Sequence, residues 1–421
     1  MRLVIYEDRS VLEDGETSEI FLEGKQSINA KARIKQIKAA FQAGFLEDLI
    51  EQEQNTPSAL DDISDFHREL MSDLVNSVTS EVGRALIGIT VMQLAIKAIC
   101  PEQNIRLHKG GAGQFSWKEG ISMRTLDKSY ITPVLRRFGL LSLNADGFMM
   151  TRSLAENYPY TKLYKAAIRG SRESWFKIVD EIDNGEIDAN DGLRYFLSLL
   201  LNRASGFQQN ADKCLELAKQ FSDKNSGNII SEFIFDFASR SDYGARLFEI
   251  ALHSIFQVLE EDGVLEGSLK PLSQMRSANK KHGNIGDVEV LLRAGSPVIL
   301  EAWDAKFGKA DLREEIEELS EKLIDHRDCV LAGFVCDQEP IINDSMQKRI
   351  DELEALHEVE ILISNASNFI DDVVVGRVTE FEEFRKKWLM AFVESICQKR
   401  RDKAPIDEPC NSWVDELIAA L

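Results

Sequence analysis

The stretch GDVEVLLRAGSPVILEAWDAKFGK, residues 286–309, predicts two strands joined by a tight turn. Residues 287–293 and 297–307 are rich in valine, isoleucine, leucine and tryptophan, and Ala-Gly-Ser at 294–296 supplies the turn. Side chains alternate between the two faces of a strand, so every second residue of this hairpin faces the same way. The sequence therefore predicts a hairpin with two distinct faces.

One of these faces carries charge. Asp304 and Lys306 share a face of the second strand, and Asp287 and Glu289 share a face of the first. A buried carboxylate is costly unless it is paired or holds a metal. Mg²⁺ takes oxygen ligands and keeps several waters, so one or two carboxylates and phosphate oxygens suffice. We therefore expect a Mg²⁺ site here, with the candidate metal ligands Asp287, Asp304 and Ala305.

Two other acidic residues of the hairpin are assigned differently. Glu301 shares the opposite face with Trp303, and we expect it to make a structural pairing. Glu289 remains open as a ligand or a rim residue.

Alternating helices and strands surround the hairpin. We predict helices at 244–260, 311–325 and 344–357, and strands at 329–336 and 359–364. The continuous apolar run CVLAGFVC is typical of a strand buried on both faces. The fold class is therefore α/β (α+β): a mixed central sheet flanked by helices, preceded by a mainly helical N-terminal part.

The charged residues of the hairpin also resemble a known signature. Asp287, followed seventeen residues later by Asp304-Ala305-Lys306, is similar to the D…(D/E)xK pattern of the PD-(D/E)XK nuclease superfamily. Gly286 stands where the family pattern often has proline, at a weakly specified position.

The resemblance implies a fold and an activity. Many members carry a glutamate on the helix before the first strand, and Glu249 fits that place. The implied core is αβββαβ over about residues 244–365. Added DNA-reading residues make the chain similar to a type II restriction endonuclease, which cuts double-stranded DNA to 5′-phosphate and 3′-hydroxyl ends. The implied catalytic residues are Asp287, Asp304, Lys306 and Glu249.

Two alternatives stay open. The same core would suit a structure-directed repair or recombination nuclease, which cuts by DNA shape. A non-catalytic DNA-binding regulator with a decayed nuclease fold belongs to a different class. A palindromic target would favour a homodimer, because protein symmetry then mirrors site symmetry. A restriction enzyme would also have a separately encoded DNA methyltransferase partner.

A basic region lies in an acidic chain. The net charge is −21, yet residues 105–172 hold twelve Lys and Arg against four Asp and Glu. Such a region is a candidate electrostatic footprint for nucleic acid. A fluctuation in surface charge is the alternative explanation.

The order of elements in this basic region is that of a winged helix. Residues 129–138 predict a short helix, Gly139 a helix stop, and Ala145-Asp146-Gly147 the turn of a hairpin that would form the wing. A solvated basic helix face is the alternative. The candidate DNA-binding residues are Arg124, Lys128, Arg136, Arg137, Arg152, Lys109 and Lys118.

The chain divides into four predicted regions. They are a helical N-terminal region (1–103), a winged-helix-like DNA-binding region (104–172), a helical connector (173–230) and the nuclease domain (231–421). The longest apolar run, at 85–96, is too short for a membrane span and predicts a buried helix. The six cysteines are scattered without a CxxC pair, which favours reduced thiols and a cytoplasmic location.

Overall fold

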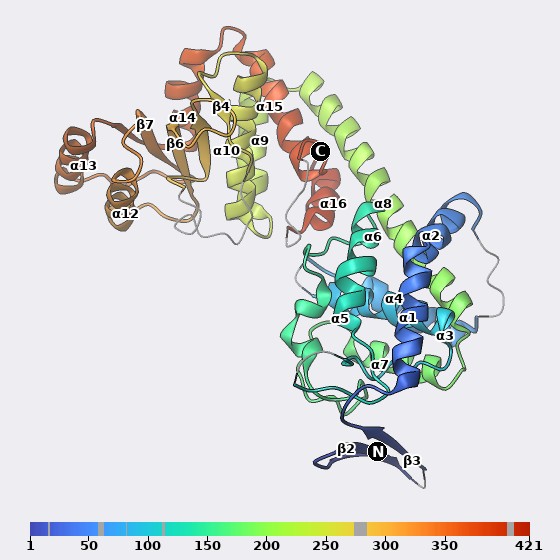
Figure 1. The fold of residues 1–421 in the computed structure, drawn as a ribbon. Helices are drawn as coiled ribbons and strands as arrows, with labels where there is room; N and C mark the ends of the chain where they lie inside the picture. The colour runs from blue at the N-terminus through green and yellow to red at the C-terminus, as the bar shows by residue number, and fades with distance from the viewer. Residues whose placement is uncertain (16, 58–62, 81, 112–113, 273–283, 402–407) are drawn as a thin grey trace. The chain divides into compact units, whose positions relative to one another are not determined.

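The computed structural model describes the chain except for residues 16, 58–62, 81, 112–113, 273–283 and 402–407 (Figure 1). The chain forms two compact units, Met1–Phe207 and Gln208–Leu421. The long helix α8 (Ala189–Lys224) contributes residues to both units. The four-part division stays a prediction.

The first unit combines a small antiparallel sheet with a set of helices. The sheet has the order β1-β2-β3. Besides the start of α8, its elements are β1 (Arg2–Ile5), β2 (Arg9–Asp14), β3 (Thr17–Leu22), α1 (Ile28–Gln42), α2 (Phe45–Asn55), α3 (Asp65–Asn76), α4 (Arg84–Ile99), α5 (Met123–Leu126), η1 (Asp127–Ile131), α6 (Thr132–Arg137), η2 (Phe148–Met150), η3 (Arg152–Ala155) and α7 (Arg172–Asp183).

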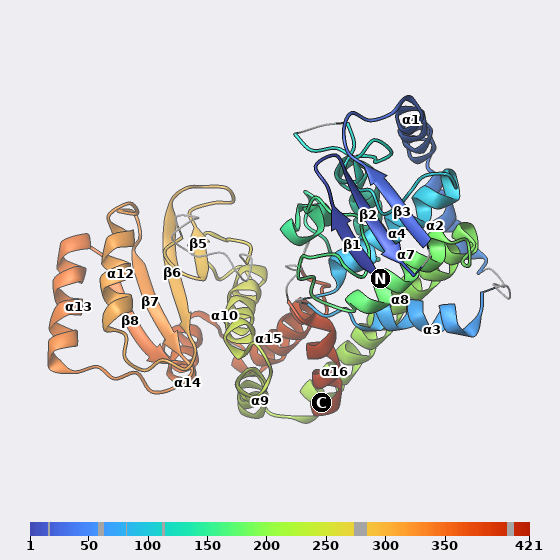
Figure 2. The same cartoon turned by 90° about the horizontal axis from the view of Figure 1, so that it is seen from below.

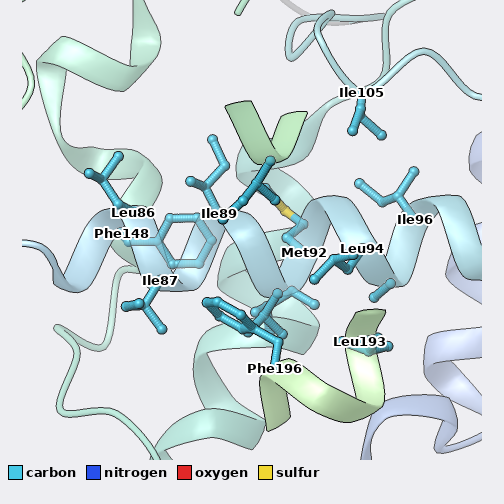
Figure 3. Packing of buried hydrophobic residues seen from close by; sticks show 14 of the residues in the cluster. Leu86, Ile87, Ile89, Met92, Leu94, Ile96, Ile105, Phe148, Leu193 and Phe196 are labelled. Carbon is cyan, nitrogen blue, oxygen red and sulfur yellow. The ribbon is translucent and has the colours of Figure 1, made fainter. Parts of the chain in front are cut away.

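Helix α4 is the centre of this unit. The apolar run at 85–96 makes it hydrophobic on every side, and it is buried along most of its length. Figure 3 shows Phe148 and residues of α8 packed around it. Gly88 permits this approach, because a Cβ atom there would collide with the Phe148 ring. The core cluster holds residues from both predicted regions 1–103 and 104–172.

The predicted helix of the basic region is present and starts earlier than expected. A continuous helical stretch runs through α5, η1 and α6, from Met123 to Arg137. Gly139 follows in a left-handed conformation with φ +66°, and its N–H donates to Arg136 O at 3.2 Å. The predicted glycine stop is therefore confirmed.

The predicted hairpin wing is wrong. Residues 140–147 form no strand, and the segment after them folds into the short 3₁₀ helices η2 and η3. Asp127 provides the physical reason, because its carboxylate accepts hydrogen bonds from Met149 N at 2.7 Å and from Thr132 Oγ1 at 2.5 Å. The buried carboxylate thus holds the segment against the helix, where Phe148 and Met149 enter the core.

The second unit contains a five-stranded mixed sheet of order β4-β5-β6-β7-β8. The first three strands are antiparallel, whereas β6, β7 and β8 are parallel. Besides the end of α8, the elements are α9 (Gly227–Arg240), α10 (Gly244–Glu261), β4 (Ser268–Leu269), β5 (Val288–Leu291), β6 (Ile299–Lys306), α12 (Arg313–Leu323), β7 (Leu331–Cys336), α13 (Asp344–His357), β8 (Glu360–Asn365), α14 (Ala366–Phe369), η4 (Ile370–Val374), η5 (Val375–Arg377), α15 (Phe381–Ile396) and α16 (Cys410–Ala420).

Helices cover both faces of this sheet. Helices α12 and α13 share a core cluster with the face that carries Ala302 and Phe334. The other face carries Trp303, which packs edge-on against Phe369 of α14, and helix α10 contacts strands β4, β5 and β6. Figure 2 shows α12 and α13 on the side of the sheet away from α10. The predicted mixed sheet flanked by helices is confirmed.

Several further expectations can be compared with the structure. Strand β4 was not predicted, and with it the described elements from α10 to β7, which leave out residues 273–283, have the order αβββαβ. The buried helix expected at 85–96 is part of α4. Within the described residues, no helix combines the length and apolarity needed to cross a bilayer. All six cysteines are buried free thiols.

Candidate active site

Strands β5 and β6 bring two carboxylates together. Val288 pairs with Trp303 in the antiparallel register, and Asp287 N donates to Trp303 O at 2.9 Å. This register places Asp287 beside Asp304, and the Asp287 carboxylate accepts a hydrogen bond from Ala305 N at 3.0 Å. The predicted convergence of Asp287 and Asp304 is therefore present.

The backbone at Gly286 passes close to the neighbouring strand. A Cβ atom at this position would lie 2.5 Å from Trp303 O, a distance that real side chains do not tolerate. The strand can therefore reach this register only with glycine at 286. Gly286 thus permits the close approach that places Asp287 beside β6.

Lys306 completes the cluster. Its Nζ lies 3.0 Å from Asp304 Oδ2, and the Lys306 and Asp304 side chains are 20% and 11% exposed. Burial, with repulsion from Asp287, raises the pKa of Asp304 to about 7, although Lys306 opposes the shift. Burial lowers the pKa of Lys306, but the charges of Asp304 and Asp287 outweigh it and the pKa is raised. A second positive charge would therefore be stabilised at these two carboxylates.

Glu249 lies on α10 near this cluster. Burial raises the pKa of Glu249, Arg246 opposes the shift, and the charge of Asp304 adds to it. Arg246 forms an ion pair with Glu249 and a second one, at 2.9 Å, with the buried Glu408. Glu408 is also paired with Arg401 at 2.7 Å. This network of two arginines and two glutamates fixes Glu249 at the edge of the cluster.

The other two acidic residues of the hairpin serve the structure. Glu301 accepts a hydrogen bond from Trp303 Nε1 at 2.6 Å, and both of its oxygens bind Arg377. The structural pairing expected for Glu301 is thus present. Glu289 is buried, pairs with Lys270 at 2.5 Å and accepts from Ile285 N at 2.6 Å. Its carboxylate is therefore already committed to these contacts.

The donor set fits a cation that keeps part of its water shell. Among the described residues, no three His, Cys, Asp or Glu side chains are grouped as a complete metal site. Asp287 and Asp304 instead form a close carboxylate pair, whose mutual repulsion a divalent cation would relieve. Two carboxylates with the main-chain oxygen of Ala305, waters and a phosphate would suit Mg²⁺.

The candidate DNA-binding residues all lie in the first unit, and most are exposed. Lys118, Arg124, Lys128, Arg137 and Arg152 are exposed, whereas Lys109 and Arg136 are half-buried. Three of the seven have acidic or amide partners: Lys128 pairs with Asp146 at 2.8 Å, Arg137 with Glu47 at 3.3 Å, and Lys109 donates to Asn157 at 2.5 Å. Arg124 contacts the Met150 sulfur. The set therefore offers positive charge at the surface of this unit.

The sequence did not predict the charged side chains that pair with or act on the site residues. Arg246 and Glu408 are far apart in the chain, so no local pattern joins them. Glu315 on α12 is another such group. Its charge acts on Lys306, although its sequence predicts only a strongly charged helix. Only the sheet against which α12 packs distinguishes Glu315 from its neighbours.

Comparison with known proteins adds no identification. No family model matches the chain, and no curated protein matches it.

Proposed function

We propose that the second unit carries the active site of a Mg²⁺-dependent endonuclease acting on double-stranded DNA, of the type II restriction class in the PD-(D/E)XK superfamily. The observation that carries the proposal is the convergence of Asp287, Asp304 and Lys306 on adjacent strands. A structural sheet has no need for this set, because a buried carboxylate at Asp304 next to the half-buried carboxylate of Asp287 destabilises it. The αβββαβ order of the described elements from α10 to β7 supports the same proposal.

In this proposal each residue of the cluster has its own task. Asp287, Asp304 and the carbonyl of Ala305 hold Mg²⁺, which when bound supplies positive charge that lowers the pKa of water and neutralises the scissile phosphate. Lys306 orients the attacking water and stabilises negative charge as it develops on the phosphate. Glu249, fixed by Arg246, is placed to accept a hydrogen bond from water near the cluster.

The basic region would bind the DNA in this proposal. Its exposed arginines and lysines suit phosphate contacts, and an arginine can also read guanine in the major groove. The helix from Met123 to Arg137 carries four of the candidate residues, Arg124, Lys128, Arg136 and Arg137. A homodimer, a separately encoded methyltransferase and a cytoplasmic location complete the proposal.

A cleavage assay tests the function directly. Purified protein is incubated with phage or plasmid DNA, with and without about 10 mM Mg²⁺, a concentration that fills weak oxygen-ligand sites. Asp304→Ala is the variant and the exposed Asp311→Ala is its matched control. The proposal expects discrete fragments that need both the metal and Asp304, with 5′-phosphate ends.

The other outcomes select the alternatives. A metal-dependent smear, or cleavage confined to branched DNA, would show that the protein does not cut at a specific sequence and would favour the structure-directed nuclease. A mobility shift that weakens steeply with salt, without cleavage, would leave the DNA-binding regulator as the remaining hypothesis.

A further inference from the structure

A water-sized cavity lies behind Asp304, between the sheet and α12. Its volume is about 10 Å³, which is room for one water molecule. The polar side chains that line it are Asp304, Glu315, Glu318 and Lys322, and the remaining lining is apolar or glycine. The cavity thus connects the candidate metal ligand on β6 with three charged side chains of α12.

Glu315 has an unsatisfied oxygen at this cavity. The side chain is only 10% exposed, and its Oε1 is paired with Lys309. Its Oε2 is buried and, among the described residues, has no hydrogen-bond partner. A buried carboxylate oxygen without a donor is costly, so this atom indicates a missing donor.

One water would satisfy this arrangement. It can donate one proton to Glu315 Oε2 and the other to Asp304. Lys322 also lines the cavity and could supply a third bond, because an ammonium has three protons and, among the described residues, its contacts are Ile285 O at 3.0 Å and Glu318 at 3.3 Å. Three polar partners are what a buried water needs.

We propose that Glu315 is a positioning residue of the metal site, acting on Asp304 through a single water held in this cavity. The inference rests on the proposed function and deepens it. Asp304 is held on one side by Lys306, and the water link to α12 holds it on the other. Groups that orient a metal ligand in this way set metal affinity, and their loss typically weakens it 10- to 100-fold.

Metal binding tests the proposal without cleavage. Mn²⁺ is titrated into the full-length protein in the absence of DNA, and free Mn²⁺ is followed by electron paramagnetic resonance. Glu315→Gln is compared with Glu314→Gln, which removes the same charge from an exposed neighbour on the same helix. We expect Glu315→Gln to weaken Mn²⁺ binding roughly tenfold, and Glu314→Gln to leave it near the wild-type value. Asp304→Asn should abolish binding.

The outcomes separate this inference from the proposed function. If Asp304→Asn abolishes Mn²⁺ binding but Glu315→Gln and Glu314→Gln bind equally, the metal site stands and the role of Glu315 is overturned. If Mn²⁺ does not bind the wild-type protein at Asp304, both proposals fail. Equal weakening by both glutamine variants would indicate only long-range charge and would also overturn the positioning role.

A crystal structure gives a second readout that needs neither metal nor DNA. Electron density for one water within hydrogen-bond distance of Asp304, Glu315 and Lys322 is expected in the wild-type protein. Loss of that water in a Glu315→Leu crystal, with the sheet unchanged, would support the link. An empty cavity in the wild-type protein would overturn it.

Discussion

Lys306 Nζ lies 3.0 Å from Asp304 Oδ2, and both side chains sit on the same face of β6, two residues apart. The pair places a cation beside a carboxylate that burial and Asp287 make difficult to ionise. The negative charges of Asp304 and Asp287 would attract a metal ion, but without the metal they lower the stability of the second unit. Stability and the proposed activity therefore make opposite demands on these carboxylates.

Asp304→Asn is expected to abolish metal-dependent cleavage while raising the free energy of unfolding at pH 8. Asparagine keeps the shape of the side chain and removes a charge that burial disfavours, a gain of roughly 1 kcal/mol. Thermal unfolding and the cleavage assay measure the two effects. A variant that still cuts, or that unfolds several degrees earlier, would contradict the expectation. Asp311→Asn on the surface serves as the control.

Lys306→Met is expected to lower the cleavage rate by about 10²–10³ without preventing DNA binding, because a preorganised charge at the reacting phosphate is worth that much. Mg²⁺ should still bind Asp287 and Asp304. Single-turnover kinetics and a mobility-shift assay separate the two effects. If DNA binding and cleavage fell by the same factor, Lys306 would contribute to DNA binding and not to the chemical step.

The stability of the first unit should depend on pH through Asp127. Burial raises the pKa of Asp127 to about 6, so the folded protein holds this proton more tightly than the unfolded chain. The resulting stabilisation is fully present below pH 3.8 and is lost as the pH rises through about 6. Asp127→Asn should remove this part of the dependence, worth at most about 3 kcal/mol.

Urea unfolding of the wild type and of Asp127→Asn between pH 3.5 and 7, roughly the window of the shifted titration, measures this difference. The asparagine variant loses an acceptor at every pH, so only the change in the difference with pH is informative. A constant offset across the range would contradict the assignment.

Gly88→Ala is expected to destabilise the first unit by about 1–3 kcal/mol, the usual cost of overpacking a core. The new methyl group would collide with Phe148, and helix α4 is too well packed to move. Gly206→Ala in α8 is the matched control, because nothing lies within 4 Å of its added Cβ. The control should be neutral or stabilising by up to about 1 kcal/mol, since alanine favours helix.

Arg152→Gln is expected to weaken DNA binding and to reduce the slope of log K against log salt by about 1, as the loss of one phosphate contact does. Lys213→Gln, an exposed residue of the second unit, removes the same charge outside the basic region and should leave the slope unchanged. Fluorescence anisotropy at several salt concentrations measures both. Equal slopes for the two variants would argue against a DNA contact at Arg152.

Much of the second unit could be predicted from local sequence patterns. Apolar periodicity placed α10 within one residue, and the continuous run before Cys336 placed β7. The alternation of side chains along β6 was enough to put Asp304 and Lys306 on one face. These features depend on residues close in the chain, which is why the sequence could predict them.

Features set by distant partners could not be predicted. The turn expected at Ala145-Asp146-Gly147 forms, but the strands expected on either side of it do not, because Asp127 binds Met149 N from twenty-two residues away. Strand β4 has only two residues, and its pairing with β5 defines it. The burial of Glu315 likewise depends on the sheet and not on its own helix.

The Arg246–Glu408 pair has a consequence for the order of events during synthesis. The two residues are 162 positions apart, so the ribosome must add that much chain after Arg246 before the pair can form. At typical elongation rates this takes roughly 8–30 s. Throughout that interval Arg246, the ion-pair partner of Glu249, is without Glu408. A nascent chain would therefore emerge before the ion-pair network behind Glu249 is complete, so the rate of translation sets a minimum delay for its assembly.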